Sequence, residues 1–175
     1  MKASYVLGYA PTIYDIDPCY LESLGIHVLI SDLDQTLASA FDQKPEPRVL
    51  ALRDELLAHH IQLMIVSNNM PKRVQPFCEA VGVPYLPFAF KFVGFRVRKW
   101  LKKLSLRVED CVFVGDQLMT DGIYVRKLHG KLILTDPLVP KDNWQTKLLR
   151  RADNKKRQRL LAHGKLGIKI PTRKS

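Results

Sequence analysis

Carboxylates, hydroxyls and a lysine follow short apolar runs in this sequence, and together these residue types suit phosphoryl transfer. The segment SDLDQTL places Asp32 and Asp34 at alternate positions directly after the run IHVLI. A carboxylate nucleophile can attack phosphorus and divide one very slow hydrolysis into two easier displacements. We therefore expect Asp32 to be the nucleophile. Asp34 is expected to protonate the leaving oxygen and then to activate water.

Four further residues could bind the phosphoryl oxygens. Thr36 belongs to the same segment, Ser67 and Asn68 follow the apolar run IQLMIV, and Lys91 lies beyond a third run. Hydroxyl, amide and ammonium donors can hold the negative charge of a phosphoryl group through the transition state. We expect Thr36, Ser67, Asn68 and Lys91 to bind phosphate.

The acidic residues also predict a metal site. GDQLMTD adds Asp116 and Asp121 to Asp32 and Asp34. Clustered carboxylates without Cys or His suit a hard cation, which would also screen the attack of an anion on an anionic phosphate. We expect Mg²⁺ with Asp32, Asp34, Asp116 and Asp121 as ligands. Any one acid could instead be a helix cap, but burying several together is costly unless a cation compensates.

Alternation of strand and helix patterns explains how these residues could meet. Strands are predicted at 26–31, 61–66, 84–88, 110–115 and 131–135, with helices starting near Pro47, Pro71, Gly94 and Leu118 and a short helix over 18–24. Parallel strands need crossovers, which are usually helices, so the pattern predicts an α/β fold with a five-stranded parallel sheet. The candidate residues follow the strands, and ligands in such sheets bind at the carboxyl ends.

Composition limits the class of protein. The chain has 175 residues, 46% hydrophobic, which is enough apolar material for a buried core, and its three scattered cysteines do not form a disulfide framework. Its apolar runs are too short to span a bilayer, and the first residues do not resemble a secretory signal. We expect a cytoplasmic protein.

The net charge of +11 is concentrated at one end. Residues 1–146 hold 17 Lys+Arg against 16 Asp+Glu, whereas residues 147–175 hold 11 against the single Asp153. We therefore expect a phosphatase domain at 1–146 and a basic C-terminal helix or tail at 147–175, with its cations apart from the catalytic residues.

The motifs resemble those of haloacid dehalogenase (HAD)-like phosphatases of subfamily IIIA, in particular the YqeG group, which is related to phosphatidylglycerophosphate phosphatases. The resemblance rests on DLDQTL at 32–37, IVSNN at 65–69, Lys91 and VGDQLMTD at 114–121. It implies a three-layer, Rossmann-like HAD fold and the roles given above for Asp32, Asp34, Ser67, Lys91, Asp116 and Asp121. It also makes phosphatidylglycerophosphate the leading substrate.

The spacing of the motifs leaves no room for a separate cap domain. About thirty residues separate Thr36 from Ser67, the length of a loop, one helix and one strand. An uncapped site is open and could admit a phosphate carried on a large molecule.

Two cationic segments suggest partners. The run from Lys91 to Arg107 contains no acid, and its Val97, Leu101 and Leu104 are expected to face the core. In the tail, a stripe of Trp144, Leu148, Leu149 and Ala152 precedes KKRQR at 155–159, which could contact acidic lipids or RNA. Peripheral contact with a membrane is therefore one expectation.

Three alternatives remain open. The chain could be a soluble phosphosugar or nucleotide phosphatase, or an RNA- or ribosome-associated module with a weak or regulatory phosphatase site. A receiver domain also uses a strand-end aspartate with Mg²⁺, but it would not need the pair Asp32 and Asp34. Because a pure binding module has no use for a leaving-group acid, Asp34 favours the enzyme.

Overall fold

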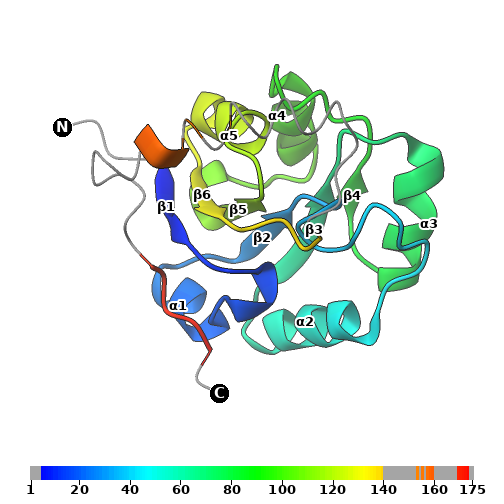
Figure 1. The fold of residues 1–175 in the computed structure, drawn as a ribbon, viewed down its shortest axis with the longest axis horizontal. Helices are drawn as coiled ribbons and strands as arrows, with labels where there is room; N and C mark the ends of the chain where they lie inside the picture. The colour runs from blue at the N-terminus through cyan, green and yellow to red at the C-terminus, as the bar shows by residue number, and fades with distance from the viewer. Residues whose placement is uncertain (1–4, 140–152, 154, 156, 160–168, 174–175) are drawn as a thin grey trace.

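Six parallel strands form one sheet in the computed structural model, which describes residues 5–139, 153, 155, 157–159 and 169–173 (Figure 1). Their order across the sheet is β1-β6-β5-β2-β3-β4. The strands are β1 (Val6–Tyr9), β2 (Val28–Ser31), β3 (Gln62–Val66), β4 (Tyr85–Leu86), β5 (Cys111–Gly115) and β6 (Lys131–Leu134). The expected parallel α/β fold is confirmed.

The prediction of five strands is wrong, because the sequence pattern did not reveal β1. This strand has only four residues, includes Gly8 and pairs with β6 through a register shift between Val6 and Gly8. Its strand conformation therefore comes from tertiary pairing more than from local propensity. The strand expected at 84–88 is also shorter, because Pro84 and Pro87 flank β4 and lack the N–H that a ladder needs.

Five α-helices connect the strands within the described part of the chain. They are α1 (Pro18–Ser23), α2 (Pro47–Ala58), α3 (Pro71–Val81), α4 (Phe95–Lys103) and α5 (Asp121–Leu128). Three of them begin at the predicted prolines, which suit a first helical turn, and Gly82 ends α3 with a φ of 75°. Helix α5 begins at Asp121, three residues later than expected, because residues 117–120 form a turn instead.

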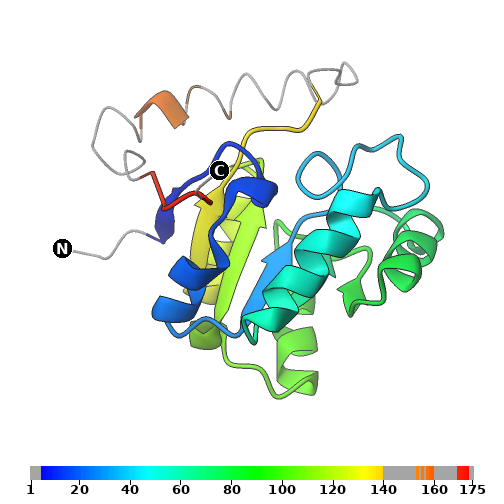
Figure 2. The ribbon, with the colours of Figure 1, turned by 90° about the horizontal axis from the view of Figure 1, so that it is seen from below.

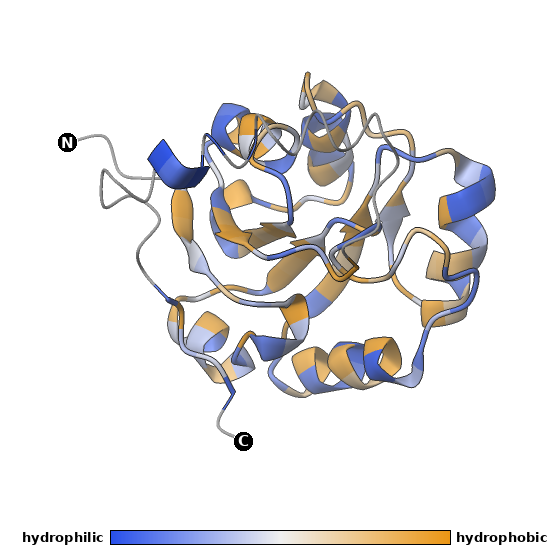
Figure 3. Cartoon of the chain, in the orientation of Figure 1, coloured by the Kyte–Doolittle hydropathy of each residue, from blue (hydrophilic) through white to orange (hydrophobic). Residues whose placement is uncertain are grey.

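The helices cover both faces of the sheet, which gives the predicted three layers (Figure 2). One apolar cluster joins Leu29, Leu63 and Val112 to residues of α1, α2 and α3, and the other joins Ile30 and Phe113 to residues of α4 and α5. Successive strand residues point to opposite faces, so each strand contributes to both clusters. Figure 3 shows the hydrophobic strands between these amphipathic helices.

One core prediction in α4 is only partly correct. Val97 and Leu101 are buried, as expected, but Leu104 lies just after the helix and is 40% exposed. The α-helix ends at Lys103, so the helical spacing that would turn Leu104 inward is not maintained.

Neither the connection after β2 nor the one after β3 inserts a cap domain over the carboxyl edge of the sheet. Between Asp32 and Ser67 the chain forms a loop, α2 and β3, and between Ser67 and Lys91 it forms α3 and β4. Every residue of these two stretches is described, so the expectation of no cap insertion holds there. In the described residues we find no helix long and apolar enough to cross a membrane. The stripe expected at Trp144, Leu148, Leu149 and Ala152 lies outside the described residues.

Candidate active site

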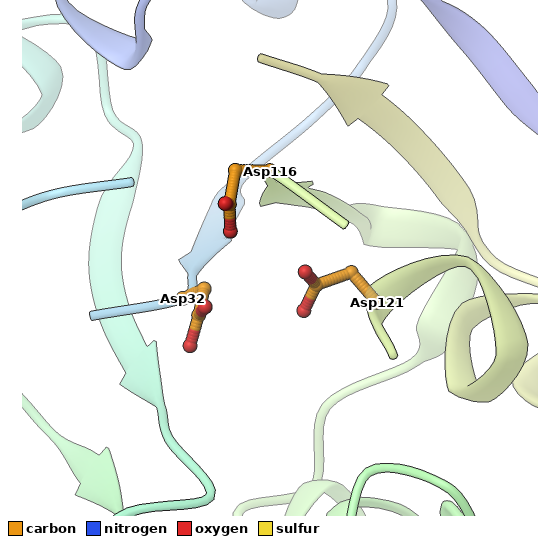
Figure 4. Close-up of side chains that lie close together, drawn as sticks. All are labelled: Asp32, Asp116 and Asp121. Carbon is orange, nitrogen blue, oxygen red and sulfur yellow. The ribbon is translucent and has the colours of Figure 1, made fainter. Parts of the chain in front are cut away.

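Three carboxylates meet at the carboxyl edge of the sheet. Asp32 directly follows β2, Asp116 directly follows β5, and Asp121 begins α5. Each offers a carboxylate oxygen, and these oxygens all lie within 4.8 Å of one another (Figure 4). Strands β2 and β5 are neighbours, and the strand order changes direction at this point, which is where α/β sheets commonly bind ligands.

Lys91 is the cation paired with this cluster. Its Nζ lies 2.5 Å from Oδ1 of Asp32 and 2.8 Å from Oδ1 of Asp121. The residue is only 1% exposed, although it lies in the loop between β4 and α4. Its backbone N–H donates to Oδ1 of Asn68 at 2.9 Å, which fixes the loop beside the end of β3.

Burial and the pairing with Lys91 have the largest effects on the electrostatics of the cluster. Removal from water raises the pKa of Asp32 well above its ordinary value; Lys91 opposes this rise, whereas Asp121 and Asp116 add to it. For Lys91, burial lowers the pKa, but the charges of Asp121 and Asp32 outweigh burial, so the pKa rises. Lys91 therefore remains protonated, whereas ionising Asp32 beside Asp116 and Asp121 is unfavourable unless further positive charge compensates it.

The turn between β5 and α5 holds Asp121 in place. Oδ2 of Asp121 accepts from the backbone N–H of Gln117 at 3.2 Å, and Asp121 is fully buried. Gly115 is required by space, since a Cβ on this residue would collide with the carboxyl group of Asp121. Sequence reasoning assigned no role to Gly115, although its place directly before Asp116 was a usable signal.

Asp34 lies apart from the three converging carboxylates. Its Oδ2 accepts from Nδ2 of Asn69 at 2.8 Å, and its Oδ1 accepts from Nη2 of Arg73 at 3.0 Å. Arg73 also donates to the carbonyl of Ser39. It therefore connects α3 to two positions of the loop after β2, Asp34 and Ser39. Neither Asn69 nor Arg73 was predicted as a site residue, although Asn69 ends the VSNN segment and Arg73 lies in the first turn of the helix that follows it.

The remaining candidates mainly contact the protein itself. Thr36 is buried and its Oγ1 makes a long 3.5 Å contact with Oδ1 of Asp116. Ser67 is buried, and its Oγ accepts from the N–H of Asn69 at 3.0 Å. Asn68 is exposed and holds the Lys91 loop. Their assignment to phosphate binding therefore remains a proposal.

Two residues of the basic tail reach the turn that carries the acids. Asp153 is 3% exposed, and its Oδ1 accepts from the N–H of Met119 at 2.8 Å. Arg157 pairs with Oδ2 of Asp153 at 3.0 Å and donates to the carbonyls of Asp116 and Thr135. Figure 2 shows this piece of the tail, in orange, beyond the carboxyl ends of the strands. The expectation that the cations of the tail lie apart from the catalytic residues is therefore wrong for Arg157.

Sequence comparison identifies the family. The chain is 31% identical over 147 residues to "Probable phosphatase YqeG" of Bacillus subtilis (strain 168), covering 84% of this chain and 86% of the relative. The chain belongs to the YqeG family of HAD-like phosphatases. The relative spans the strand-end motifs, so the family resemblance seen in the sequence is confirmed. No protein-family model matches the chain.

Solved structures similar to this YqeG-family chain include two sugar-phosphate phosphatases. The cobalt-bound deoxy-D-mannose-octulosonate 8-phosphate phosphatase of Haemophilus influenzae is 15% identical, with a TM-score of 0.49 over 79% of this chain and 94% of that one. The 3-deoxy-D-manno-octulosonate 8-phosphate phosphatase of Moraxella catarrhalis, in complex with magnesium, phosphate and KDO, is also 15% identical, with a TM-score of 0.49 over 82% and 97%.

Proposed function

We propose that this YqeG-family chain is a Mg²⁺-dependent phosphomonoesterase that forms an aspartyl-phosphate on Asp32. The observation that supports this most directly is the convergence of Asp32, Asp116 and Asp121 around buried Lys91. A purely structural cluster of three carboxylates drawn together away from water would be unfavourable without enough positive charge to compensate it.

Asp32 supplies the nucleophile. One of its carboxylate oxygens attacks phosphorus, the P–O bond to the leaving alkoxide breaks, and the alkoxide takes a proton from Asp34. Water then attacks the phosphorus of the acyl phosphate and gives a proton to Asp34. Inorganic phosphate leaves, and the carboxylate of Asp32 is regenerated.

Asp34 suits the acid and base roles because its orientation is fixed from two sides. Asn69 and Arg73 each donate to one of its oxygens, and its side chain is 18% exposed, so it borders the open part of the site. A leaving alcohol and the later water can both approach from this side. The groups that hold Asp34 are thus positioning residues.

Lys91 is suited to hold the phosphoryl group against Asp32. It remains charged, and its Nζ already lies within hydrogen-bond distance of the Asp32 oxygen that would carry the phosphoryl group. A donor prepared at this point stabilises the charge that develops on phosphoryl oxygens without reorganisation during the reaction.

The acid cluster fits a hard divalent cation. The side chains of Asp32, Asp116 and Asp121 could hold Mg²⁺, since their oxygens converge, and carboxylate is the ligand type that Mg²⁺ prefers. When bound, Mg²⁺ would screen the charge of the phosphate and polarise a phosphoryl oxygen. The carboxylate of Asp34, which was also expected to bind the metal, is turned toward Asn69 and Arg73 instead.

The substrate that the family resemblance favours is phosphatidylglycerophosphate, and the uncapped edge is consistent with a phosphate on a large headgroup. The experiment is a panel of phosphomonoesters that includes phosphatidylglycerophosphate in mixed micelles, phosphosugars and nucleotides. It should be run with Mg²⁺, with excess chelator, and with Asp32→Asn as the inactive control. Preferred turnover of a soluble phosphosugar or nucleotide would replace the lipid as substrate. Turnover of no compound at all would contradict the phosphomonoesterase proposal.

A further inference from the structure

In the loop that carries Lys91, the lysine is buried and the phenylalanines are exposed, which is the reverse of the usual arrangement. In the segment Phe88–Phe92, Ala89 is fully buried and Lys91 is 1% exposed. The three phenylalanines between and beside them are 38%, 49% and 48% exposed, in chain order. Large apolar side chains usually enter the core and lysines stay in water. This loop therefore presents its aromatic rings to the surroundings.

Backbone contacts hold the loop in this orientation. The N–H of Phe88 donates to the carbonyl of Asn69 at 2.8 Å, and the N–H of Ala89 donates to the carbonyl of Ser67 at 2.9 Å. Phe88 and Phe90 adopt φ values of 50° and 47°, a region that bulky residues rarely occupy. Turning the rings inward would withdraw Lys91 from Asp32, so their exposure is coupled to the formation of the catalytic cluster.

The apolar surface continues into α4. Val93 is 61% exposed and Phe95, the first residue of α4, is 63% exposed. Positions four and seven residues after Phe95 lie on the same face of the helix, and these are Lys99 and Lys102, both exposed. The run from Lys91 to Arg107 contains no acidic residue. Figure 3 shows the hydrophobic segment that leads from β4 into α4.

We propose that residues 88–95 and the cationic face of α4 form a docking surface for an anionic lipid bilayer, with the open catalytic edge turned toward the headgroups. Exposed contiguous apolar surface bordered by cations marks such interfaces. The rings enter the boundary between headgroups and acyl chains, while Lys99 and Lys102 attract anionic headgroups. Docking would allow the enzyme to hydrolyse a phosphate held at the bilayer, and this consequence rests on the proposed phosphomonoesterase function.

The docking experiment measures co-sedimentation of the full chain with phosphatidylcholine vesicles that contain or lack phosphatidylglycerol. The variant Phe92→Ser/Phe95→Ser should bind the anionic vesicles at least about tenfold more weakly, since two rings no longer leave water. Its matched control is Leu57→Ser, because Leu57 is 64% exposed near the end of α2 and away from the loop. The control should bind as wild type does.

Charge reversal tests the cationic face of α4. Lys99→Glu should weaken binding about fivefold or more at low salt and less at high salt, whereas Lys131→Glu, at the start of β6, should have no effect. Turnover of p-nitrophenyl phosphate by the phenylalanine variant should match wild type, because neither ring contacts the acid cluster.

Two further measurements test whether the docking surface binds a lipid bilayer and separate docking from catalysis. Relative to wild type, whose Trp100 and Trp144 set the background, brominated lipid should quench Phe92→Trp more strongly than Leu57→Trp. Equal vesicle binding by wild type and the phenylalanine variant would overturn the docking proposal, particularly if that variant lost RNA binding or dissociated from a dimer. Absence of turnover in every form would instead contradict the phosphomonoesterase proposal and leave the vesicle result valid.

Discussion

The two acids of the DLD segment lie in different surroundings, although only one residue separates them. Asp32 joins Lys91, Asp116 and Asp121 in the buried half of the site, where its pKa is raised by burial. Asp34 lies in the open half, in the loop after β2, where it is paired with Arg73 and Asn69. In the proposed mechanism, the buried half would meet the phosphoryl group that all substrates share. The open half would meet the leaving group that differs between substrates.

The largest expected effect comes from the buried half. Asp32→Asn should reduce turnover about 10,000-fold or more on every phosphomonoester, because the proposed mechanism needs the Asp32 carboxylate to attack phosphorus. Steady-state kinetics on a lipid and a soluble substrate measure this, with circular dichroism to show that the variant folds. Turnover within about tenfold of wild type would disprove the nucleophile assignment.

Substitution in the open half should stop the reaction at a different step. Asp34→Asn should lower turnover about a thousandfold, since both protonation of the leaving group and activation of water are lost. With p-nitrophenyl phosphate, whose leaving group needs little protonation, the variant should release a burst of nitrophenol and accumulate phosphorylated Asp32. Rapid-quench kinetics and mass spectrometry detect these species. A slow first turnover without a burst would contradict the division between the halves.

Metal dependence should belong to the buried half. Asp116→Asn should lower turnover roughly a hundredfold and abolish the rise in melting temperature that Mg²⁺ gives the wild type. Without Mg²⁺, the variant should melt no lower than wild type, because three clustered acids then become two. Differential scanning fluorimetry with Mg²⁺ or chelator measures both effects. Undiminished stabilisation by Mg²⁺ would exclude Asp116 as a ligand.

Arg73 offers a finer test of the open half. Arg73→Ala should lower turnover roughly tenfold on alkyl phosphates and less on p-nitrophenyl phosphate, because a loosely held Asp34 protonates a poor leaving group less well. The comparison is made as a ratio of turnover on the two substrates. A uniform loss would indicate a general structural role for Arg73 instead.

The smallest expected effect concerns the tail. Arg157→Ala should reduce turnover and Mg²⁺ affinity by only about threefold, because its contact with the carbonyl of Asp116 helps to orient the metal-binding turn. Lys155→Ala, an exposed neighbour in the same basic run, should behave as wild type. Isothermal titration with Mg²⁺ and kinetics on a soluble substrate measure both variants. Equal turnover and Mg²⁺ affinity in Arg157→Ala and Lys155→Ala would show that Arg157 does not support the site.

The sequence predicted the parts of the molecule that local pattern encodes. Asp32, Asp116 and Lys91 each follow an apolar run. Because ligands bind at the carboxyl ends of parallel strands, the sequence alone predicted that these residues share one site. Strand β1 and the engagement of Arg157 could not be predicted, because both depend on contacts between residues far apart in the chain. The exposure of the phenylalanines could not be predicted either, since the alternating pattern FAFKF at 88–92 predicts that the rings point inward and Lys91 points outward.

The first strand lies between two late segments of the chain. Val6 pairs with Leu132 of β6, the backbone of Tyr9 forms a bridge with Lys169, and Ile170 is buried against the same core. During synthesis, β1 cannot pair with β6 until residue 134 has been made, and its bridge to Lys169 must wait longer still. Contacts over such long sequence separations form slowly. This edge of the sheet thus closes only after Lys169 has been made, and loss of the segment around Lys169 would leave β1 open to pairing with other chains.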